Sequence, residues 1–360
     1  MTKYAVNRFR NVTIALNTPF DAKGEISLAA TRNFVQYQYT KGVRSLYVCG
    51  STGEGFLLSI PERKQILEAV VSAAPEDMTI IVHVGTAATR EAVDLAAHAA
   101  ETGAHATSAV PCVYYRPGEE SIYRHWTAIT EAADLPFFIY NIPQLTGYSL
   151  SMPMFRRMLQ NERVAGIKCS SESVQDIMHF KEEGGKDFIV FNGPDEQYLA
   201  GRIMGADAGI GGTYAAMPEL YLKLENLIRE GRIDVALNLQ RMITAFIARL
   251  CTFGSLYGTV KAIVRLDGCD IGDTRAPFLP VSSENPDVIR LHRDIKAAIR
   301  DRFGISEHDA DLHADLVYKH ENRIRLVDDH REFSERLAHK ARLQTHVAVA
   351  HLSFDFRLRS

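Results

Sequence analysis

Short apolar segments alternate with stretches of helical periodicity through the first two thirds of this 360-residue chain. Eight such segments recur roughly every 25 to 30 residues, and they are apolar throughout rather than at every second position. Continuous apolar strands are typical of a parallel sheet that is buried on both faces. We predict strands at residues 12–18, 45–50, 79–85, 106–110, 136–141, 164–170, 188–193 and 208–212.

The number of strand–helix units favours a closed barrel. Helical periodicity follows most of the strands, at residues 28–41, 61–74, 89–102, 118–133 and 173–183. Eight units are the number that closes a (β/α)8 barrel. The rival is an open, doubly wound sheet, but no Gly-x-Gly-x-x-Gly turn follows the first strand. We therefore predict an α/β fold, a (β/α)8 TIM barrel with a C-terminal helical extension.

Local signals place several helix boundaries. Ser59 supplies an N-terminal cap with Pro61 in the first turn, and Gly42 and Gly103 mark helix ends. After the eighth strand, further helices are expected at residues 218–229, 232–251, 257–267 and 285–303. We expect the barrel and these helices to form one domain, residues 1–303.

The composition shifts beyond Gly304. Seven of the thirteen histidines lie between His308 and His351, at irregular spacings that fit no metal template. We expect residues 304–360 to be a separate histidine-rich tail that is helical or partly disordered. A regulatory or oligomerisation role for this tail stays open.

Composition and charge exclude several classes of protein. Apolar residues make up 46% of the chain and charged residues 24%, which is normal for a globular protein with a sizeable core. The net charge of −3 and the absence of a Lys/Arg block argue against nucleic acid. No signal peptide or membrane-spanning stretch is visible, and the five cysteines form no C-x-x-C pair. We therefore expect a cytoplasmic protein with reduced thiols, no metal and no membrane partner.

Lys168 stands at the tip of the sixth predicted strand, and Tyr140 at the tip of the fifth. A lysine amine forms a Schiff base with a carbonyl only when it is unprotonated, and burial lowers its pKa from about 10.4. A neighbouring tyrosine hydroxyl can move the protons that such chemistry requires. The alternative is an ordinary exposed lysine just past a strand, next to a core tyrosine.

A glycine-rich stretch follows the second predicted strand. Residues 50–55 read Gly-Ser-Thr-Gly-Glu-Gly and include the adjacent hydroxyls of Ser51 and Thr52. Glycines such as Gly53 let backbone amides approach a ligand closely, and hydroxyls together with amides suit a carboxylate. We expect this stretch to hold a small keto acid, although a tight turn with a serine cap is the alternative.

Residues able to line a polar site also follow other predicted strands. In a (β/α)8 barrel the carboxyl ends of the strands form one face, where function gathers. We therefore expect these residues to converge with Lys168 and Tyr140 at one mouth. The set is Tyr115, Ser170, Gly193, Asp195, Glu196 and Gly212.

Together, the motifs around Ser51, Tyr140 and Lys168 resemble those of the pyruvate-dependent class I aldolases of the dihydrodipicolinate synthase and N-acetylneuraminate lyase family. The resemblance covers residues 10–303. It implies that Lys168 forms an imine with the keto carbon of pyruvate and that Tyr140 relays protons. It also implies that Ser51 and Thr52 hold the pyruvate carboxylate.

The resemblance implies an assembly and the absence of a cofactor. Tyr115 matches a tyrosine that, in family members, supports the proton relay from a neighbouring subunit, so a homotetramer is implied. The protonated imine at Lys168 is itself the electron sink, so the implied reaction needs no metal or organic cofactor.

A few positions separate the branches of the family. In the synthases of this family, an arginine at the position that matches Leu145 clamps a second carboxylate of the substrate. The leucine found here therefore argues against a role in lysine biosynthesis. Asp195 and Glu196 look like the segment with which the lyases hold the sugar hydroxyls, although acids in the first turn of a helix are also favoured by its dipole. Gly212 stands where the lyases carry a serine that contacts the distal arm of the sugar, so this chain departs from them at that contact, and Ser170 stands where they carry threonine, which is a mild change.

We therefore expect a lyase that reversibly cleaves N-acetylneuraminate, a keto sugar acid, to pyruvate and N-acetylmannosamine. The enzymatic alternatives are another 2-keto-3-deoxy sugar acid aldolase or dehydratase and 4-hydroxy-tetrahydrodipicolinate synthase. A phosphorylated substrate also stays open, because Gly209, Gly211 and Gly212 lie where some barrels bind phosphate. The non-enzymatic alternative is a regulatory protein that binds a keto acid and uses the tail as its output.

Overall fold

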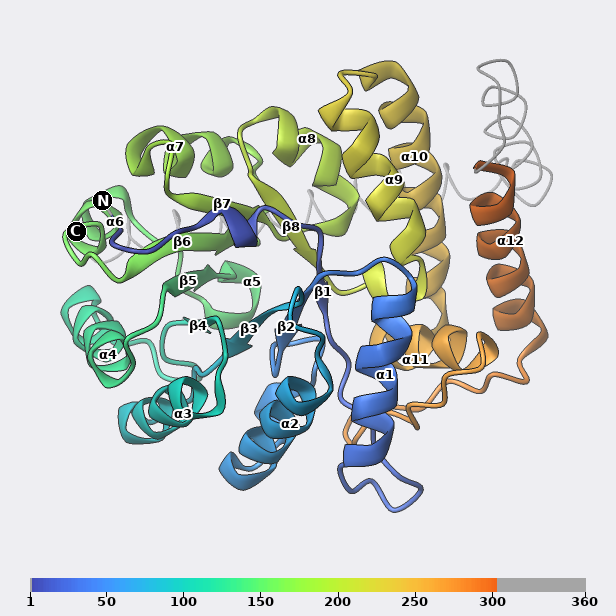
Figure 1. Cartoon of the computed structure of the whole chain (residues 1–360), viewed down its shortest axis with the longest axis horizontal. Helices are drawn as coiled ribbons and strands as arrows, with labels where there is room; N and C mark the ends of the chain where they lie inside the picture. Colours follow the sequence, from blue (N-terminus) through green and yellow to red (C-terminus); the bar gives the residue numbers. More distant parts are fainter. Residues whose placement is uncertain (1, 303–360) are drawn as a thin grey trace, which may run out of the picture. The chain divides into compact units, whose positions relative to one another are not determined.

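Eight parallel strands close into a barrel in the computed structural model, which describes residues 2–302 (Figure 1). Each strand pairs with the next along the chain, and β1 pairs with β8 to close the ring. All eight lie within the predicted segments, so the predicted barrel is confirmed. The predicted tail at residues 304–360 lies outside the described residues. The strands are β1 (Thr13–Ala15), β2 (Ser45–Val48), β3 (Thr79–His83), β4 (Ala106–Ala109), β5 (Phe137–Asn141), β6 (Val164–Cys169), β7 (Ile189–Asn192) and β8 (Ala208–Gly211).

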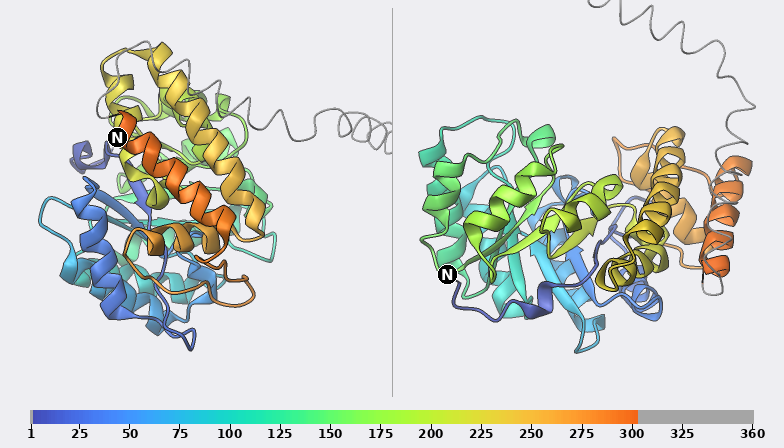
Figure 2. Two further views of the ribbon diagram at one scale, coloured as in Figure 1. Left: turned by 90° about the vertical axis from the view of Figure 1, so that its right-hand side faces the viewer. Right: turned by 90° about the horizontal axis from the view of Figure 1, so that it is seen from above.

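Helices surround the barrel and form the C-terminal extension (Figure 2). The predicted helices are confirmed to within two residues at each end, whereas the short helices α5, α6 and α8 are not predicted by the sequence pattern. The helices are α1 (Leu28–Thr40), α2 (Ile60–Ala73), α3 (Thr89–Thr102), α4 (Glu119–Ala132), α5 (Pro143–Thr146), α6 (Met152–Met158), α7 (Gln175–Gly184), α8 (Tyr198–Ile203), α9 (Pro218–Arg229), α10 (Ile233–Leu250), α11 (Leu256–Leu266) and α12 (Pro286–Arg302).

The helix boundaries follow from local chemistry. At the start of α2 the Ser59 hydroxyl accepts a hydrogen bond from the Glu62 backbone N–H, and the Glu62 carboxylate accepts one from the Ser59 N–H, which is a complete capping box. Gly42 and Gly103, just after α1 and α3, have φ of 90° and 93°, a conformation that glycine adopts without strain. The predicted signals therefore mark these helix ends correctly.

Two buried layers make up the core. Inside the barrel lie alternate side chains of the strands, among them Tyr47, Phe138 and Tyr140. The intervening side chains, such as Leu46 and Ile139, belong to the layer between the barrel and its helices. The strands are therefore buried on both faces, which explains why apolar residues run continuously along them.

The C-terminal extension packs beside the barrel and returns to its mouth. Helices α9 and α12 pack against α10 (Figure 1), and α11 packs against the turn that follows β8. The segment between α11 and α12 then reaches the loop after β2, where the Arg275 guanidinium donates to the Leu57 carbonyl and pairs with Glu62. Within residues 2–302 no single helix is long and apolar enough to cross a membrane, and α10 with α11 qualifies only as a pair bent by 109°.

Candidate active site

Lys168 and Tyr140 face each other across neighbouring strands. Lys168 on β6 is the register partner of Tyr140 on β5, and both residues are buried, with 5% and 2% of their surface exposed. The Lys168 Nζ lies 4.1 Å from the centre of the Tyr140 ring. Within residues 2–302 no carboxylate oxygen lies within 4.0 Å of this nitrogen. Attack by the amine on a carbonyl would therefore break no ion pair, and the alternative of an exposed lysine is wrong.

Two further rings, Tyr47 and His83, complete an aromatic cluster around the amine. The Lys168 Nζ lies 4.5 Å from the centre of the Tyr47 ring. Tyr47 and His83 each pack almost perpendicular to Tyr140, with ring centres 5.9 Å apart. Sequence reasoning misses both residues, because each lies inside an apolar strand segment. Their polar atoms at alternate, barrel-facing positions are the signal that could have found them.

His83 is enclosed at the end of β3 and is neutral. The Val110 backbone N–H donates to its Nε2 at 3.3 Å, so the ring proton is on Nδ1, which lies 3.2 Å from the Cys49 carbonyl oxygen. Burial lowers the pKa of His83 well below its usual value, and the nearby charges of Arg63 and Lys168 lower it further. His83 is therefore a hydrogen-bonded neutral ring rather than a cation.

The loop after β2 is folded tightly against the barrel. Cys49 and Glu54 have positive φ of 58° and 55°, and a Cβ at Gly53 would lie 2.8 Å from a carbonyl oxygen just after β1. Only glycine fits at that approach. Ser51 is half-buried and Thr52 is buried, and neither hydroxyl has a hydrogen-bond partner in the described part of the chain. Both hydroxyls can therefore bind a ligand, as a carboxylate site requires.

A buried ion pair anchors this loop to the C-terminal extension. Glu54 Oε1 lies 2.8 Å from Lys261 Nζ on α11, and neither side chain is more than 1% exposed. Lys261 also donates to the carbonyl oxygens of Thr18 and Asp273, and Glu54 Oε2 accepts the Arg275 backbone N–H at 2.8 Å. Burial lowers the pKa of Lys261 to about 8. The loop that carries the two free hydroxyls is thus held from the extension side.

Asp195 joins the ends of β7 and β8. Its Oδ2 accepts hydrogen bonds from the Thr213 backbone N–H at 2.7 Å and from the Thr213 hydroxyl at 2.5 Å. Burial raises the pKa of the Asp195 carboxyl to about 6, against these hydrogen bonds. Glu196, in contrast, is exposed. Oδ2 of Asp195 is therefore engaged by the protein, whereas Oδ1 has no hydrogen-bond partner within residues 2–302.

Close backbone contacts bring the small predicted residues together. A Cβ at Gly193 would lie 2.0 Å from Ser170 Oγ, so the ends of β6 and β7 touch. A Cβ at Gly212 would lie 2.8 Å from Thr52 Oγ1, so the end of β8 faces the loop after β2. The predicted residues of five strand ends therefore do converge on one mouth of the barrel.

Tyr115 stands apart from the other predicted site residues. It is 72% exposed and lies beside Tyr114, which is 90% exposed. The two rings pack edge to face at 5.1 Å, and Tyr114 has a φ of 72°, which is uncommon for a bulky residue. No hydrogen bond or ring contact joins Tyr115 to another predicted site residue within residues 2–302. A single chain does not bring Tyr115 into the site.

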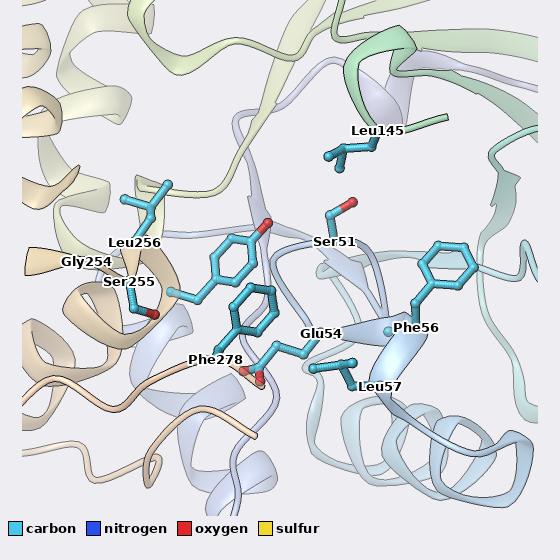
Figure 3. Close-up of a pocket in the computed structure, with 11 residues that line it drawn as sticks. Ser51, Glu54, Phe56, Leu57, Leu145, Gly254, Ser255, Leu256 and Phe278 are labelled. Carbon is cyan, nitrogen blue, oxygen red and sulfur yellow. The ribbon is translucent and has the colours of Figure 1, made fainter. Parts of the chain in front are cut away.

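A cavity of about 440 Å³ opens beside Ser51 (Figure 3). Leu145, after β5, points into the same open space as Ser51. The Tyr257 and Phe278 rings pack edge to face at 5.3 Å in its wall, and burial raises the pKa of Tyr257 to about 12. Most of the wall is apolar, which suits a ligand that carries an apolar group. The large apolar side chains of the wall are Phe56, Leu57, Leu145, Leu256, Tyr257 and Phe278.

Comparisons with known proteins agree with this geometry. The model of the dihydrodipicolinate synthetase family matches residues 8–298. An N-acetylneuraminate lyase of Mediterraneibacter gnavus is 38% identical over 288 residues, which cover 79% of this chain and 91% of that protein. An N-acetylneuraminate lyase of Escherichia coli strain K12 is 36% identical over 276 residues, which cover 76% of this chain and 93% of that protein.

Solved structures of both branches share the fold. The wild-type sialic acid aldolase of Ruminococcus gnavus matches with a TM-score of 0.80 and 37% identity, over 82% of this chain and 100% of that chain. A dihydrodipicolinate synthase of Bacillus anthracis matches with a TM-score of 0.75 and 26% identity, over 82% of this chain and 99% of that chain. The resemblance drawn from the strand-end motifs is confirmed, and the chain belongs to the dihydrodipicolinate synthetase family of pyruvate-dependent class I aldolases.

Proposed function

We propose that this protein reversibly cleaves N-acetylneuraminate to pyruvate and N-acetylmannosamine through an imine at Lys168. The observation that carries the proposal is the register pairing of Lys168 with Tyr140, which puts the amine 4.1 Å from the phenol ring with no acidic partner among the described residues. Further support comes from two N-acetylneuraminate lyases that are 38% and 36% identical to the chain.

The proposed chemistry begins at the keto carbon C2 of the bound acid. The Lys168 amine adds to C2, Tyr140 protonates the hydroxyl of the carbinolamine, and water leaves to give the protonated imine. The Tyr140 phenolate then accepts the proton of the C4 hydroxyl, and the C3–C4 bond breaks. C4 becomes the aldehyde of N-acetylmannosamine, and the electron pair enters the enamine at C3. Tyr140 returns the proton to C3, and water hydrolyses the imine to free pyruvate and Lys168.

The carboxylate of the keto acid has a natural position at the loop after β2. The hydroxyls of Ser51 and Thr52 have no partner within residues 2–302, and Gly53 allows close approach to the backbone. Each hydrogen bond to a carboxylate contributes about 1.5 to 3 kcal/mol. The ion pair of Glu54 with Lys261 holds this loop before a ligand arrives, so little ordering is left to the binding step.

The mouth supports an arm that combines hydroxyls with an apolar substituent. Leu145 lines the cavity where a guanidinium would be needed to clamp a second carboxylate, so a dicarboxylic product is disfavoured. The methyl of an N-acetyl group can pack against the apolar wall that includes Tyr257 and Phe278. The free oxygen of Asp195 and the exposed Glu196 can accept hydrogen bonds from sugar hydroxyls.

A second candidate substrate is another 2-keto-3-deoxy sugar acid. Gly212 offers no side-chain hydroxyl at the end of β8, and a Cβ there would meet Thr52 Oγ1 at 2.8 Å. This end of the site therefore lacks one donor for a long polyol arm, which favours a shorter sugar acid. The same imine at Lys168 would serve that reaction.

We also infer an oligomer from the two exposed tyrosines. In a homotetramer, as the family implies, Tyr115 would extend toward the Tyr140 of a neighbouring subunit and support its proton relay. The 72% exposed ring of Tyr115, next to the strained Tyr114, supports an interface at this loop. Sedimentation velocity tests the assembly, and a monomer that is fully active would contradict it.

The experiment that tests the proposal is pyruvate release from N-acetylneuraminate, coupled to a lactate dehydrogenase readout. We expect release by the wild type and none by Lys168→Ala. Borohydride reduction with pyruvate should add a stable mass to the peptide that contains Lys168. An adduct without release from N-acetylneuraminate would move the substrate to another keto sugar acid, whereas no adduct in the folded wild type would exclude the imine.

A further inference from the structure

His83 ties together the ends of three neighbouring strands. Its Nδ1–H donates to the carbonyl of Cys49, after β2, at 3.2 Å. Its Nε2 accepts the backbone N–H of Val110, after β4, at 3.3 Å. The ring itself belongs to the last residue of β3. Because both nitrogens are bonded to backbone groups, the imidazole is fixed in position and in tautomer, and neither nitrogen is left for a substrate.

Tyr140 lacks any comparable polar restraint. Its hydroxyl has no hydrogen-bond partner within residues 2–302, so packing alone locates its ring. The rings of Tyr47 and His83 pack against it, each with its centre 5.9 Å from the centre of the Tyr140 ring and with interplanar angles of 82° and 89°. Tyr47 is itself anchored by a hydrogen bond from its hydroxyl to Ser108 Oγ at 3.0 Å. Edge-to-face contacts of this kind contribute about 0.5 to 1.5 kcal/mol beyond area burial.

The charged groups near His83 favour its neutral form. The Arg63 guanidinium donates to the His83 carbonyl at 2.5 Å and to the Gly85 carbonyl at 2.9 Å, and it has no acidic partner within 4.0 Å in the described residues. Lys168 is the second cation that acts on the imidazole. A proton on Nε2 would add a third positive charge and would break the bond from Val110. The other titratable groups around the ring are Tyr47, Tyr140 and Cys49.

We propose that His83 is the positioning residue for Tyr140: the neutral imidazole, fixed by the backbone of Cys49 and Val110, holds the phenol ring where its hydroxyl can serve the imine at Lys168. This inference rests on the proposed role of Tyr140 as the proton relay, and it gives His83 no contact with the substrate. Loss of the ring should therefore slow the proton transfers, including the one that dehydrates the carbinolamine, and leave the equilibrium level of the imine unchanged.

Deuterium exchange at C3 of pyruvate in heavy water measures this proton transfer without any sugar. Exchange requires the imine at Lys168, the enamine and a group that moves the C3 proton, and nuclear magnetic resonance follows the loss of the methyl signal. We expect His83→Ala to slow exchange at least about ten-fold, since a positioned proton donor contributes about 10² to 10⁴-fold. After incubation with pyruvate to equilibrium, borohydride should trap the adduct on Lys168 at the wild-type level.

A double-mutant cycle distinguishes positioning from a general structural effect. If His83 acts through Tyr140, His83→Ala should slow exchange less than about two-fold in a chain that already carries Tyr140→Phe. His83→Gln, which keeps one donor and one acceptor, should give an intermediate rate and provides a milder variant if alanine destabilises the fold. Losses that multiply in the double variant would overturn the inference.

His125 provides a matched control. It is also a buried histidine whose pKa burial lowers, to about 4, but it is on α4, where Thr89 Oγ1 lies 2.9 Å from its Nδ1. His125→Ala should leave the exchange rate unchanged, and an equal loss in this variant would mean that His83 acts only through the fold. Absence of the adduct in the wild type would instead remove the imine itself, so failure of the proposed function is seen separately.

Discussion

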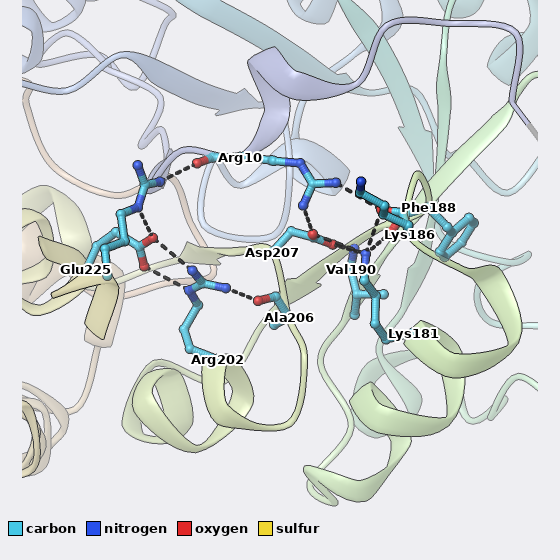
Figure 4. Close-up of polar contacts among 10 residues, drawn as sticks. Arg10, Lys181, Lys186, Phe188, Val190, Arg202, Ala206, Asp207 and Glu225 are labelled. Atoms are coloured by element: carbon cyan, nitrogen blue, oxygen red, sulfur yellow. Dashed lines mark hydrogen bonds and ion pairs between the residues drawn. The ribbon is translucent and has the colours of Figure 1, made fainter. Parts of the chain in front are cut away.

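At the amino ends of the strands, Asp207 and Glu225 are each surrounded by basic side chains (Figure 4), whereas at the carboxyl ends Lys168 has no acidic neighbour within 4.0 Å among residues 2–302. Asp207 forms ion pairs with Arg10 and Lys181, and it also accepts a hydrogen bond from the backbone N–H of Val190 on β7. Its side chain is 4% exposed.

Glu225, on helix α9, is also a buried acid that basic side chains surround. Its carboxylate lies 2.8 Å from the Arg202 Nε and 2.6 Å from the Arg229 Nε, and the Tyr198 hydroxyl donates to it at 2.7 Å. A carboxylate that is 5% exposed is tolerated only when its oxygens are bonded in this way. The Arg229 guanidinium also donates to the Arg10 carbonyl, which links the two groups of charges.

The difference teaches how one barrel separates stability from chemistry. At the amino end each buried acid is neutralised, so these groups hold the helices to the strands and have nothing left for a ligand. At the carboxyl end the amine of Lys168 and the hydroxyls of Ser51, Thr52 and Tyr140 are left without polar partners within residues 2–302. A substrate can supply the missing polar partners of those groups. Substitutions at the carboxyl end should therefore lower activity with little effect on the free energy of unfolding. Substitutions at the amino end should lower the free energy of unfolding with little effect on activity.

The largest expected effect is on turnover at the carboxyl end. Tyr140→Phe keeps the ring that packs against His83 and removes only the hydroxyl, so kcat should fall by about 10² to 10⁴-fold with little change in stability. Pyruvate release measures kcat, and the borohydride adduct on Lys168 should still reach the wild-type level at equilibrium with pyruvate, because Tyr140 affects how fast the carbinolamine loses water and not how much imine is present at equilibrium. Tyr37→Phe, which removes a hydroxyl bonded to Asp267 at the end of α11 in the extension, should leave kcat unchanged. A normal rate in Tyr140→Phe would give the proton relay to another group.

The next effect belongs to the amino end and concerns stability alone. Glu225→Gln removes the charge that Arg202 and Arg229 surround, so the free energy of unfolding should fall by about 3 kcal/mol. Denaturant unfolding measures this loss, and kcat of the folded variant should match the wild type. Glu230→Gln, which changes an exposed pair with Arg232, should cost less than about 1 kcal/mol. A drop in kcat for Glu225→Gln would mean that the two ends are coupled.

Asp195 lies at the carboxyl end, but its Oδ2 is hydrogen-bonded to Thr213. Its substitution should therefore change both the binding of the sugar acid and the free energy of unfolding. Asp195→Asn should raise KM for the sugar acid by about ten-fold, because a carboxylate acceptor becomes an amide, and should leave pyruvate binding unchanged. Competition between the sugar acid and pyruvate measures the two half-sites separately. Equal affinity for the sugar acid in the variant and the wild type would confine Asp195 to its bond with Thr213.

The same variant has a pH signature. The pKa of Asp195 is raised from 3.8 to about 6 in the folded state, so the folded protein binds this proton more tightly than the unfolded chain. Protonation therefore contributes stability that is present in full below pH 3.8 and is lost as the pH rises through 6. The difference in unfolding free energy between wild type and Asp195→Asn should change across that range and be constant above pH 7.

The sequence was sufficient for the barrel because eight continuous apolar strands leave few other arrangements. Each strand lies within its predicted segment, and Pro218–Arg229, helix α9, matches its prediction at both ends. Helices α5 and α8 were beyond reach, because four and six residues are too short to show a helical period. A pattern in sequence predicts an element only when the element is long enough to repeat it.

The site was predictable where strands that follow one another along the chain are paired in the barrel. Tyr140 and Lys168 lie on consecutive strands, and their pairing follows from the strand order. His83 and Tyr47 lie on β3 and β2, which do not pair with β5 or β6, and their distances to Tyr140 depend on side-chain packing that no local motif encodes. The bond from Thr213 to Asp195 was equally hidden, since it spans the loops after β7 and β8.

The smallest expected effect tests how closely the carboxyl end is fitted. A Cβ at Gly212 would lie 2.8 Å from Thr52 Oγ1, so Gly212→Ala should force that hydroxyl to turn away from a bound carboxylate. Pyruvate should then bind roughly three- to ten-fold more weakly, as expected for one weakened hydrogen bond, and the pyruvate dependence of borohydride labelling measures this. Gly118→Ala is the control, because a Cβ at Gly118 meets nothing within 4 Å. In a Thr52→Ala chain the Gly212→Ala substitution should cost nothing further, because the group that it displaces is already gone. An equal cost in both chains would show that the Thr52 hydroxyl does not hold the carboxylate.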